Sequence, residues 1–192
     1  MKTDLRIVKT KDALHAALIR LLETKPLEKI TITELCQKAK INRGTFYLHY
    51  QEIGDVFEEY FREITADLAK SYEEPYRHVS VLKTSELDPS TLRIFHHVKT
   101  YQPFYEIVLS KRVPLQYYYL FYEEVNRLFL NDHHAAQWEF PDIQRELYCA
   151  YQANAIIGMI LYWHQHEFRA SAQEMNEQLV AILHRTLADK PT

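Results

Sequence analysis

The chain has 192 residues and a formal net charge of −3, and 47% of its residues are hydrophobic, with only three glycines and seven prolines. This composition argues against a disordered chain and a turn-rich all-β fold, and it favours an all-α protein. No apolar stretch is long enough to span a bilayer, and the N-terminus lacks the apolar core of a signal peptide. We therefore expect a cytoplasmic protein without membrane contact.

The charges are distributed unevenly along the chain. Residues 1–50 carry a net charge of +5, and the remaining residues carry −8. A positive end on a negative body is expected of a protein whose small head binds a polyanion, although solvated charges can also cluster in this way by chance.

The first predicted helix covers residues 10–23, because apolar side chains recur there at helical spacing. A basic arm precedes and opens it, formed by Lys2, Arg6, Lys9 and Lys11. This arm either rests on phosphates or is a frayed and solvated terminus.

Residues 30–50 predict two short helices joined by a tight turn. Thr31 precedes Glu34 by three residues, which is the spacing of a capping box, and the first helix then runs to Ala39. Asn42 is a favourable N-cap for a second helix of about two turns that begins at Arg43. This arrangement predicts a helix-turn-helix, and the alternative is an ordinary helical hairpin in an all-α core.

In a helix-turn-helix, the first residues of the second helix meet base edges in the major groove. Arg43 can donate two hydrogen bonds to guanine, Thr45 can bond to a base or touch a thymine methyl, and Gly44 lets the backbone come close. The other predicted DNA-binding residues are Thr31, Thr33, Tyr47, His49 and Tyr50, and the first four carry donors suited to phosphate oxygens.

The segment KITITELCQKAKINRGTFYLHYQEIGDVFEEY, residues 29–60, resembles the DNA-binding domain of TetR-family transcriptional regulators. Residues 44–50 match the run of Gly or Ser, Thr, aromatic, Tyr, any residue, His and aromatic in the family's recognition helix, and the resemblance covers about residues 8–65. One departure is Ile53, because the family usually has a phosphate-contacting lysine at this position.

A helix predicted over residues 55–72 links the motif to the rest of the chain. Loops are predicted at 73–89 and 131–141, and further helices at 89–99, 103–110, 114–130, 142–168 and 172–188. We expect a DNA-binding domain over residues 1–70, including the linking helix, and a regulatory and dimerisation domain over residues 71–192.

The last two predicted helices are apolar on more than one face, so they need neighbours on both sides. Gly158 in the middle of the first of them suggests a close backbone approach. A homodimer in which these helices form a four-helix bundle satisfies both features, and TetR-like proteins pair in this way. The alternative is a fully buried core in a monomer.

The C-terminal part is also rich in aromatic residues, which either form its core or line a cavity for a small flat or apolar effector. The candidate ligand-binding residues are Tyr105, Tyr118, Tyr122, Tyr151 and Trp163. The paired histidines lack the i, i+4 spacing of helical metal sites, so we expect no metal, no cofactor and no enzymatic activity. The two distant cysteines, Cys36 and Cys149, are expected to be buried reduced thiols.

Together the motif and the resemblance imply a homodimeric regulator that binds a pseudo-palindromic operator in double-stranded DNA. The expected function is repression that is released by a small-molecule effector. The alternative is a co-activator or adaptor of the same fold that is controlled by a protein partner.

Overall fold

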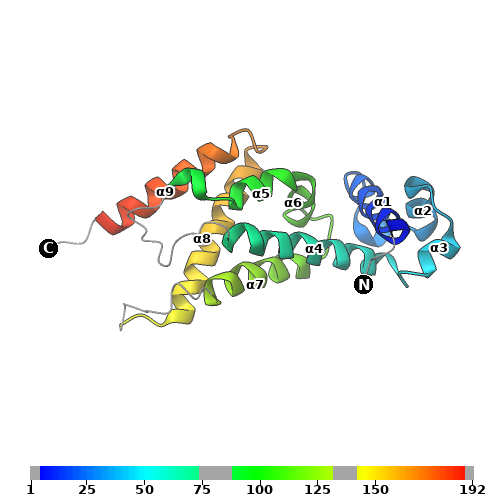
Figure 1. The fold of residues 1–192 in the computed structure, drawn as a ribbon, viewed down its shortest axis with the longest axis horizontal. Helices are drawn as coiled ribbons and strands as arrows, with labels where there is room; N and C mark the ends of the chain where they lie inside the picture. The colour runs from blue at the N-terminus through cyan, green and yellow to red at the C-terminus, as the bar shows by residue number, and fades with distance from the viewer. Residues whose placement is uncertain (1–4, 74–87, 132–141, 189–192) are drawn as a thin grey trace. The chain divides into compact units, whose positions relative to one another are not determined.

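The computed structural model describes residues 5–73, 88–131 and 142–188 (Figure 1). Within these ranges every regular element is helical and no strand is present, so the predicted all-α fold is confirmed. The predicted loops at 73–89 and 131–141 lie almost entirely outside the described residues. None of the helices described is long and apolar enough to cross a membrane.

The chain forms two compact units, which we call the head unit (Met1–Ile64 with Pro103–Tyr118) and the body unit (Thr65–Gln102 with Tyr119–Thr192). The head unit contains α1 (Leu5–Leu22), η1 (Leu27–Lys29), α2 (Ile32–Ala39), α3 (Arg43–Tyr47), the first part of α4 (Ile53–Glu73) and nearly all of α6 (Gln102–Val108). The body unit contains the rest of α4, η4 (Pro89–Thr91), α5 (Ile94–Thr100), most of α7 (Gln116–Leu130), α8 (Arg145–Gln165) and α9 (Ala172–Ala188).

Helix α1 begins at Leu5, five residues before its predicted start, so the prediction of a separate basic arm is wrong from Leu5 onward. No proline or glycine interrupts this stretch, and the Thr10 hydroxyl donates to the carbonyl of Arg6 inside the helix at 2.8 Å. Lys11 belongs to the helix and pairs with Glu59 at 2.5 Å. Lys2 lies outside the described residues.

Large apolar side chains from α1, α2, α3 and α4 form the core of the head unit. Its fully buried members are Leu14, Leu18, Leu22, Leu35, Phe46, Val56 and Phe57. The three leucines of α1 recur every four residues and form the face that packs on α2. Burying such a side chain stabilises the fold by about 1.5–3 kcal/mol, which holds α2 and α3 in place although helices of their length are unstable alone.

Residues 103–118 pack on the first part of α4 within the head unit. Phe104 contacts Phe61, with ring centroids 5.7 Å apart, and Tyr117 lies edge-on to Phe57 at 4.6 Å. The backbone N–H of Leu27 donates to the carbonyl of Arg112 at 2.9 Å. These contacts tie the segment that follows α6 directly to the turn before the helix-turn-helix.

In the body unit, α8 has one buried face and one exposed face. The buried face consists of Cys149, Ala153, Ile156, Ile157, Ile160 and Trp163. The helix is shorter than predicted because Glu167 and Phe168 adopt left-handed backbone conformations (φ 56° and 51°), which end it after Gln165. Both cysteines are buried, as predicted.

Candidate nucleic-acid interface

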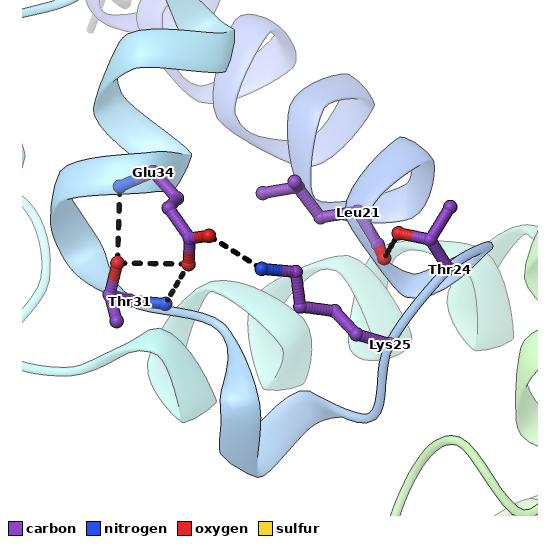
Figure 2. A network of polar contacts seen from close by, with 5 residues as sticks. All are labelled: Leu21, Thr24, Lys25, Thr31 and Glu34. Atoms are coloured by element: carbon purple, nitrogen blue, oxygen red, sulfur yellow. Dashed lines mark hydrogen bonds and ion pairs between the residues drawn. The ribbon is translucent and has the colours of Figure 1, made fainter.

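The start of α2 is fixed by the predicted capping box (Figure 2). The Glu34 N–H donates to the Thr31 hydroxyl at 3.3 Å, and the Thr31 N–H donates to the Glu34 carboxylate at 3.0 Å. Lys25 donates to the other carboxylate oxygen at 2.5 Å, as Figure 2 shows. The Lys25 bond, followed by the two bonds from Thr31, lowers the pKa of Glu34 to about 2. The capping-box prediction is confirmed.

The turn between α2 and α3 is built around Lys40, which has a left-handed backbone conformation with φ 57°. Its N–H donates to carbonyls in the last turn of α2, which is a common way to end a helix. Asn42 then caps α3 as predicted, because its side-chain oxygen accepts from the Thr45 N–H at 2.7 Å. These two local devices direct the chain from α2 into α3.

Helix α3 is shorter than the predicted two turns and ends at Tyr47. The N–H groups of His49 and Tyr50 both donate to the carbonyl of Phe46, so the following residues tighten into a turn. Phe46 is fully buried beneath α3, whereas Leu48 is 80% exposed. The short helix is therefore held in place by the buried side chain of Phe46, and most of its remaining surface faces solvent.

The predicted base-reading residues lie on the exposed side of α3. Arg43 and Gly44 are exposed, and the Arg43 guanidinium donates to the hydroxyl of Tyr47 at 3.3 Å and lies 5.9 Å from its ring centroid. Thr45 is half-buried, and its hydroxyl donates to the capping oxygen of Asn42 at 3.0 Å. Arg43 is thus braced by a side chain one turn later.

The remaining predicted DNA-binding residues differ in exposure. Thr31 and Thr33 are exposed and His49 is half-buried. Tyr50 is buried, and its hydroxyl donates to Glu59. Tyr50 therefore points into the head unit in this structure and supports α3 from within, and it does not face outward as a DNA-binding residue would.

Ile53 is the first residue of α4 and is buried. The side chain at this position packs into the protein, so it supplies no phosphate contact here. The exposed basic residues of the motif are Lys29, Lys38, Lys40 and Arg43.

The five candidate ligand-binding residues are divided between the two units. Tyr105 and Tyr118 belong to the head unit, and Tyr122, Tyr151 and Trp163 belong to the body unit. Trp163 is buried with its indole N–H donating to the carbonyl of Ala170 at 3.0 Å, and Tyr151 is 61% exposed. In the described single chain, Trp163 thus uses its polar atom internally and Tyr151 faces outward.

The described residues contain no group of three His, Cys, Asp or Glu side chains that could hold a metal ion. The geometry that they do contain, a capped helix, a tight turn and a short exposed second helix, defines a helix-turn-helix protein of the DNA-binding class.

The chain belongs to the TetR family of transcriptional regulators. The TetR family model described as "Transcriptional regulator C-terminal region" matches residues 85–185, which is more than half of the chain. The uncharacterized HTH-type transcriptional regulator YxbF of Bacillus subtilis is 22% identical over 165 residues. That match covers 85% of this chain but only 42% of the length of YxbF.

Solved structures share the fold at low sequence identity. A putative TetR-family regulator from Syntrophomonas wolfei has a TM-score of 0.72 at 15% identity, covering 95% of this chain and 96% of its own. The dihydroxyacetone kinase operon activator DhaS has a TM-score of 0.66 at 18% identity, covering 95% and 98%. NalD, the secondary repressor of the MexAB-OprM multidrug efflux pump in Pseudomonas aeruginosa, has a TM-score of 0.67 at 17% identity, covering 92% and 96%.

Proposed function

We propose that this TetR-family regulator is a sequence-specific repressor that binds a pseudo-palindromic operator as a homodimer and is released by a small-molecule effector. The observation that supports DNA binding is the way in which α3 is packed and exposed. The helix is held from below by Phe46 and turns Arg43, Gly44 and Tyr47 outward. Binding to chromosomal DNA would place the protein in the cytoplasm. A regulator of this kind needs no catalytic group.

The exposed side of α3 suggests a division of labour on DNA. Arg43 can exchange its bond to Tyr47 for a bidentate pair with guanine, which is a common base-specific contact. Because the Thr45 hydroxyl donates to Asn42, it keeps an acceptor lone pair and its methyl group for a base edge. Thr31, Thr33 and His49 would contact phosphates and set the register.

The exposed face of α8 supports the proposed homodimer. Leu147, Tyr151 and Tyr162 are 65%, 61% and 59% exposed, and with Gly158 they fall on one stripe of the helix. Apart from Gly158 itself, its chain neighbours and the backbone of its own helix, no described atom lies within 4 Å of the place where a Cβ of residue 158 would stand. On α9, Ile182 is 51% exposed. A second copy would cover these side chains by pairing α8 and α9 across a two-fold axis.

Residues 1–70 would then act as the DNA-binding domain and residues 71–192 as the regulatory and dimerisation domain. An effector held among the aromatic residues of the body unit, with Tyr122 as the first candidate, would change the spacing of the two DNA-binding domains. A dimer that occupies its operator blocks transcription without further contacts, whereas an activator needs an additional surface for its partner.

The first experiment is selection of bound duplexes from a random DNA pool at two salt concentrations. The proposal predicts an enriched two-fold symmetric sequence whose binding weakens steeply with salt. Arg43→Ala should then cost about 1–3 kcal/mol in affinity and relax the preference at one base position. Arg20→Ala is the matched control, because it removes an exposed arginine from α1, outside the helix-turn-helix.

A reporter with the selected sequence inside its promoter tests the direction of regulation. Repression predicts that transcription falls when the protein is present. A rise would indicate an activator, and no enriched sequence from a folded dimer would instead favour an adaptor that is controlled by a protein partner.

A further inference from the structure

Glu59 of α4 connects three parts of the helix-turn-helix region through one carboxylate. Its Oε1 atom accepts a hydrogen bond from Lys11 of α1 at 2.5 Å. Its Oε2 atom accepts from the hydroxyl of Tyr50, which lies three residues after the end of α3. The same Oε2 lies 3.6 Å from Nε2 of His15, a buried side chain of α1.

The contact with Tyr50 is partly shielded from water. Tyr50 is 6% exposed and the Glu59 side chain 23% exposed. Burial raises the pKa of Glu59, but the bonds from Lys11 and Tyr50 outweigh it and lower the pKa, so the carboxylate is ionised at neutral pH and acts purely as an acceptor. A hydrogen bond to an ionised acceptor is stronger than one between neutral groups and has a preferred direction.

Helix α3 has few other means of holding its orientation. It is five residues long, its N-terminus is capped by Asn42, and the only side chain within it that is buried is Phe46. A packed ring resists withdrawal but not small rotations of so short a helix, because dispersion contacts are not directional. The bond from Tyr50 to Glu59 supplies a directional tie at the C-terminal end, opposite the cap.

We propose that Glu59 is a positioning residue for DNA recognition, which holds the C-terminal end of α3 through the Tyr50 hydroxyl and so fixes the angle at which Arg43 meets the major groove. This inference rests on the proposed DNA-binding function. It assigns to Tyr50 a role inside the protein, and it makes the hydroxyl, which a phenylalanine would lack, a determinant of sequence discrimination.

The test uses three variants: Tyr50→Phe, Glu59→Gln and the double variant that combines these two changes. Glu58→Gln serves as the control. Glu58 is the exposed neighbour of Glu59 on α4, so its change to Gln matches the loss of charge. Each protein is titrated with the duplex selected by the wild type and with a scrambled duplex of the same composition. Hydrogen exchange of the amides of residues 43–50 and of α1 is followed in parallel.

We expect Tyr50→Phe to bind the selected duplex about tenfold more weakly while its affinity for the scrambled duplex stays within about twofold. Amides of residues 43–50 should exchange faster while those of α1 stay protected. The double variant should bind no more weakly than the weaker single variant, because both changes act on the same contact between Tyr50 and residue 59. Tyr50→Phe removes one oxygen only, so it remains folded even if Glu59→Gln, which also removes the ion pair with Lys11, does not.

Three results would overturn the inference while leaving the proposed function intact. The first is that both single variants discriminate between the duplexes as well as Glu58→Gln does. The second is an equal loss for both duplexes, and the third is an additive loss in the double variant. If the wild type selects no sequence at all, the proposed function fails, and this inference fails with it.

Discussion

The helix-turn-helix and α8 reach their structures in opposite ways. In α2 and α3, local polar bonds set the boundaries: Thr31 with Glu34 at one helix start and Asn42 with Thr45 at the other. In α8, 21 residues form one uninterrupted helix. No side chain caps its N-terminus, and a left-handed turn follows its C-terminus. The first region is specified by what its residues bond to nearby, and the second by what packs against it.

This difference teaches where each region is vulnerable. A short helix held by one buried ring and a cap fails when either is removed, because it has almost no stability of its own. A long helix survives the loss of individual contacts, but Leu147, Tyr151 and Tyr162 of α8 are exposed in the single chain. Substitutions on the exposed face of α8 should therefore affect association of the chain more than its folding.

The largest effect is expected at the anchor of α3. Phe46→Ala should lower the free energy of unfolding by about 3–5 kcal/mol, because it leaves a cavity under a helix that has no other buried side chain of its own. Leu48→Ala, two residues later and 80% exposed, should change it by less than about 0.5 kcal/mol. Urea denaturation at one fixed protein concentration measures both. Equal losses would mean that α3 is not anchored through Phe46.

The second effect tests the exposed face of α8. Tyr151→Glu should weaken the proposed homodimer by about 2–3 kcal/mol, or roughly a hundredfold in its dissociation constant, because an unpaired charge would be buried in the interface. Tyr119→Glu on α7 is the control, since Tyr119 is 57% exposed but lies outside the proposed interface. Sedimentation velocity across a dilution series distinguishes them. A Tyr151→Glu protein that stays dimeric would place the interface elsewhere.

The sequence predicted the capping bonds of the helix-turn-helix, but it predicted little of how α8 packs. Residue pairs three apart, such as Thr31 with Glu34, can be recognised in the sequence because a helix start brings them together by local geometry. The bond from Tyr50 to Glu59 could not be recognised, because it depends on how the turn after α3 packs on α4. For α8, apolar residues on both faces do not reveal which face is the core, and the structure was needed to place Tyr151 outside and Trp163 inside.

The third prediction separates a capping role from a phosphate contact. Thr31→Ala should cost about 1 kcal/mol of stability, because it removes the acceptor of the capping box. Thr33→Ala is the matched change one residue inside α2, where no cap depends on the exposed side chain, and should cost less than about 0.5 kcal/mol. Both should weaken DNA binding if both contact phosphates. Thermal unfolding separates the variants, and an equal loss of stability would argue against the cap as the source.

The smallest effect compares the two units through their buried histidines. In the head unit, burial lowers the pKa of His15 despite the opposing charges of Glu59 and Asp12, with Lys11 adding to the decrease, and Glu63 and the ring of Tyr60 also lie beside it. In the body unit, burial lowers the pKa of His97, although its Nδ1–H donates to Asp67 at 3.0 Å and the Asp67 charge opposes the shift. The ring of Tyr101 lies next to it.

Because both native pKa values lie below the unfolded value of about 6.5, the unfolded chain binds protons first as the pH falls. The stability that these neutral histidines contribute is present above pH 6.5 and is lost as the pH falls through the native pKa values. Each group can change the free energy of unfolding by at most about 1.4 kcal/mol per pH unit. His15→Gln and His97→Gln should each flatten the decline between about pH 7.5 and 5.5. If neither does, the native pKa values do not lie below the unfolded value, and the ion pairs of His15 with Glu59 and of His97 with Asp67 offset the effect of burial.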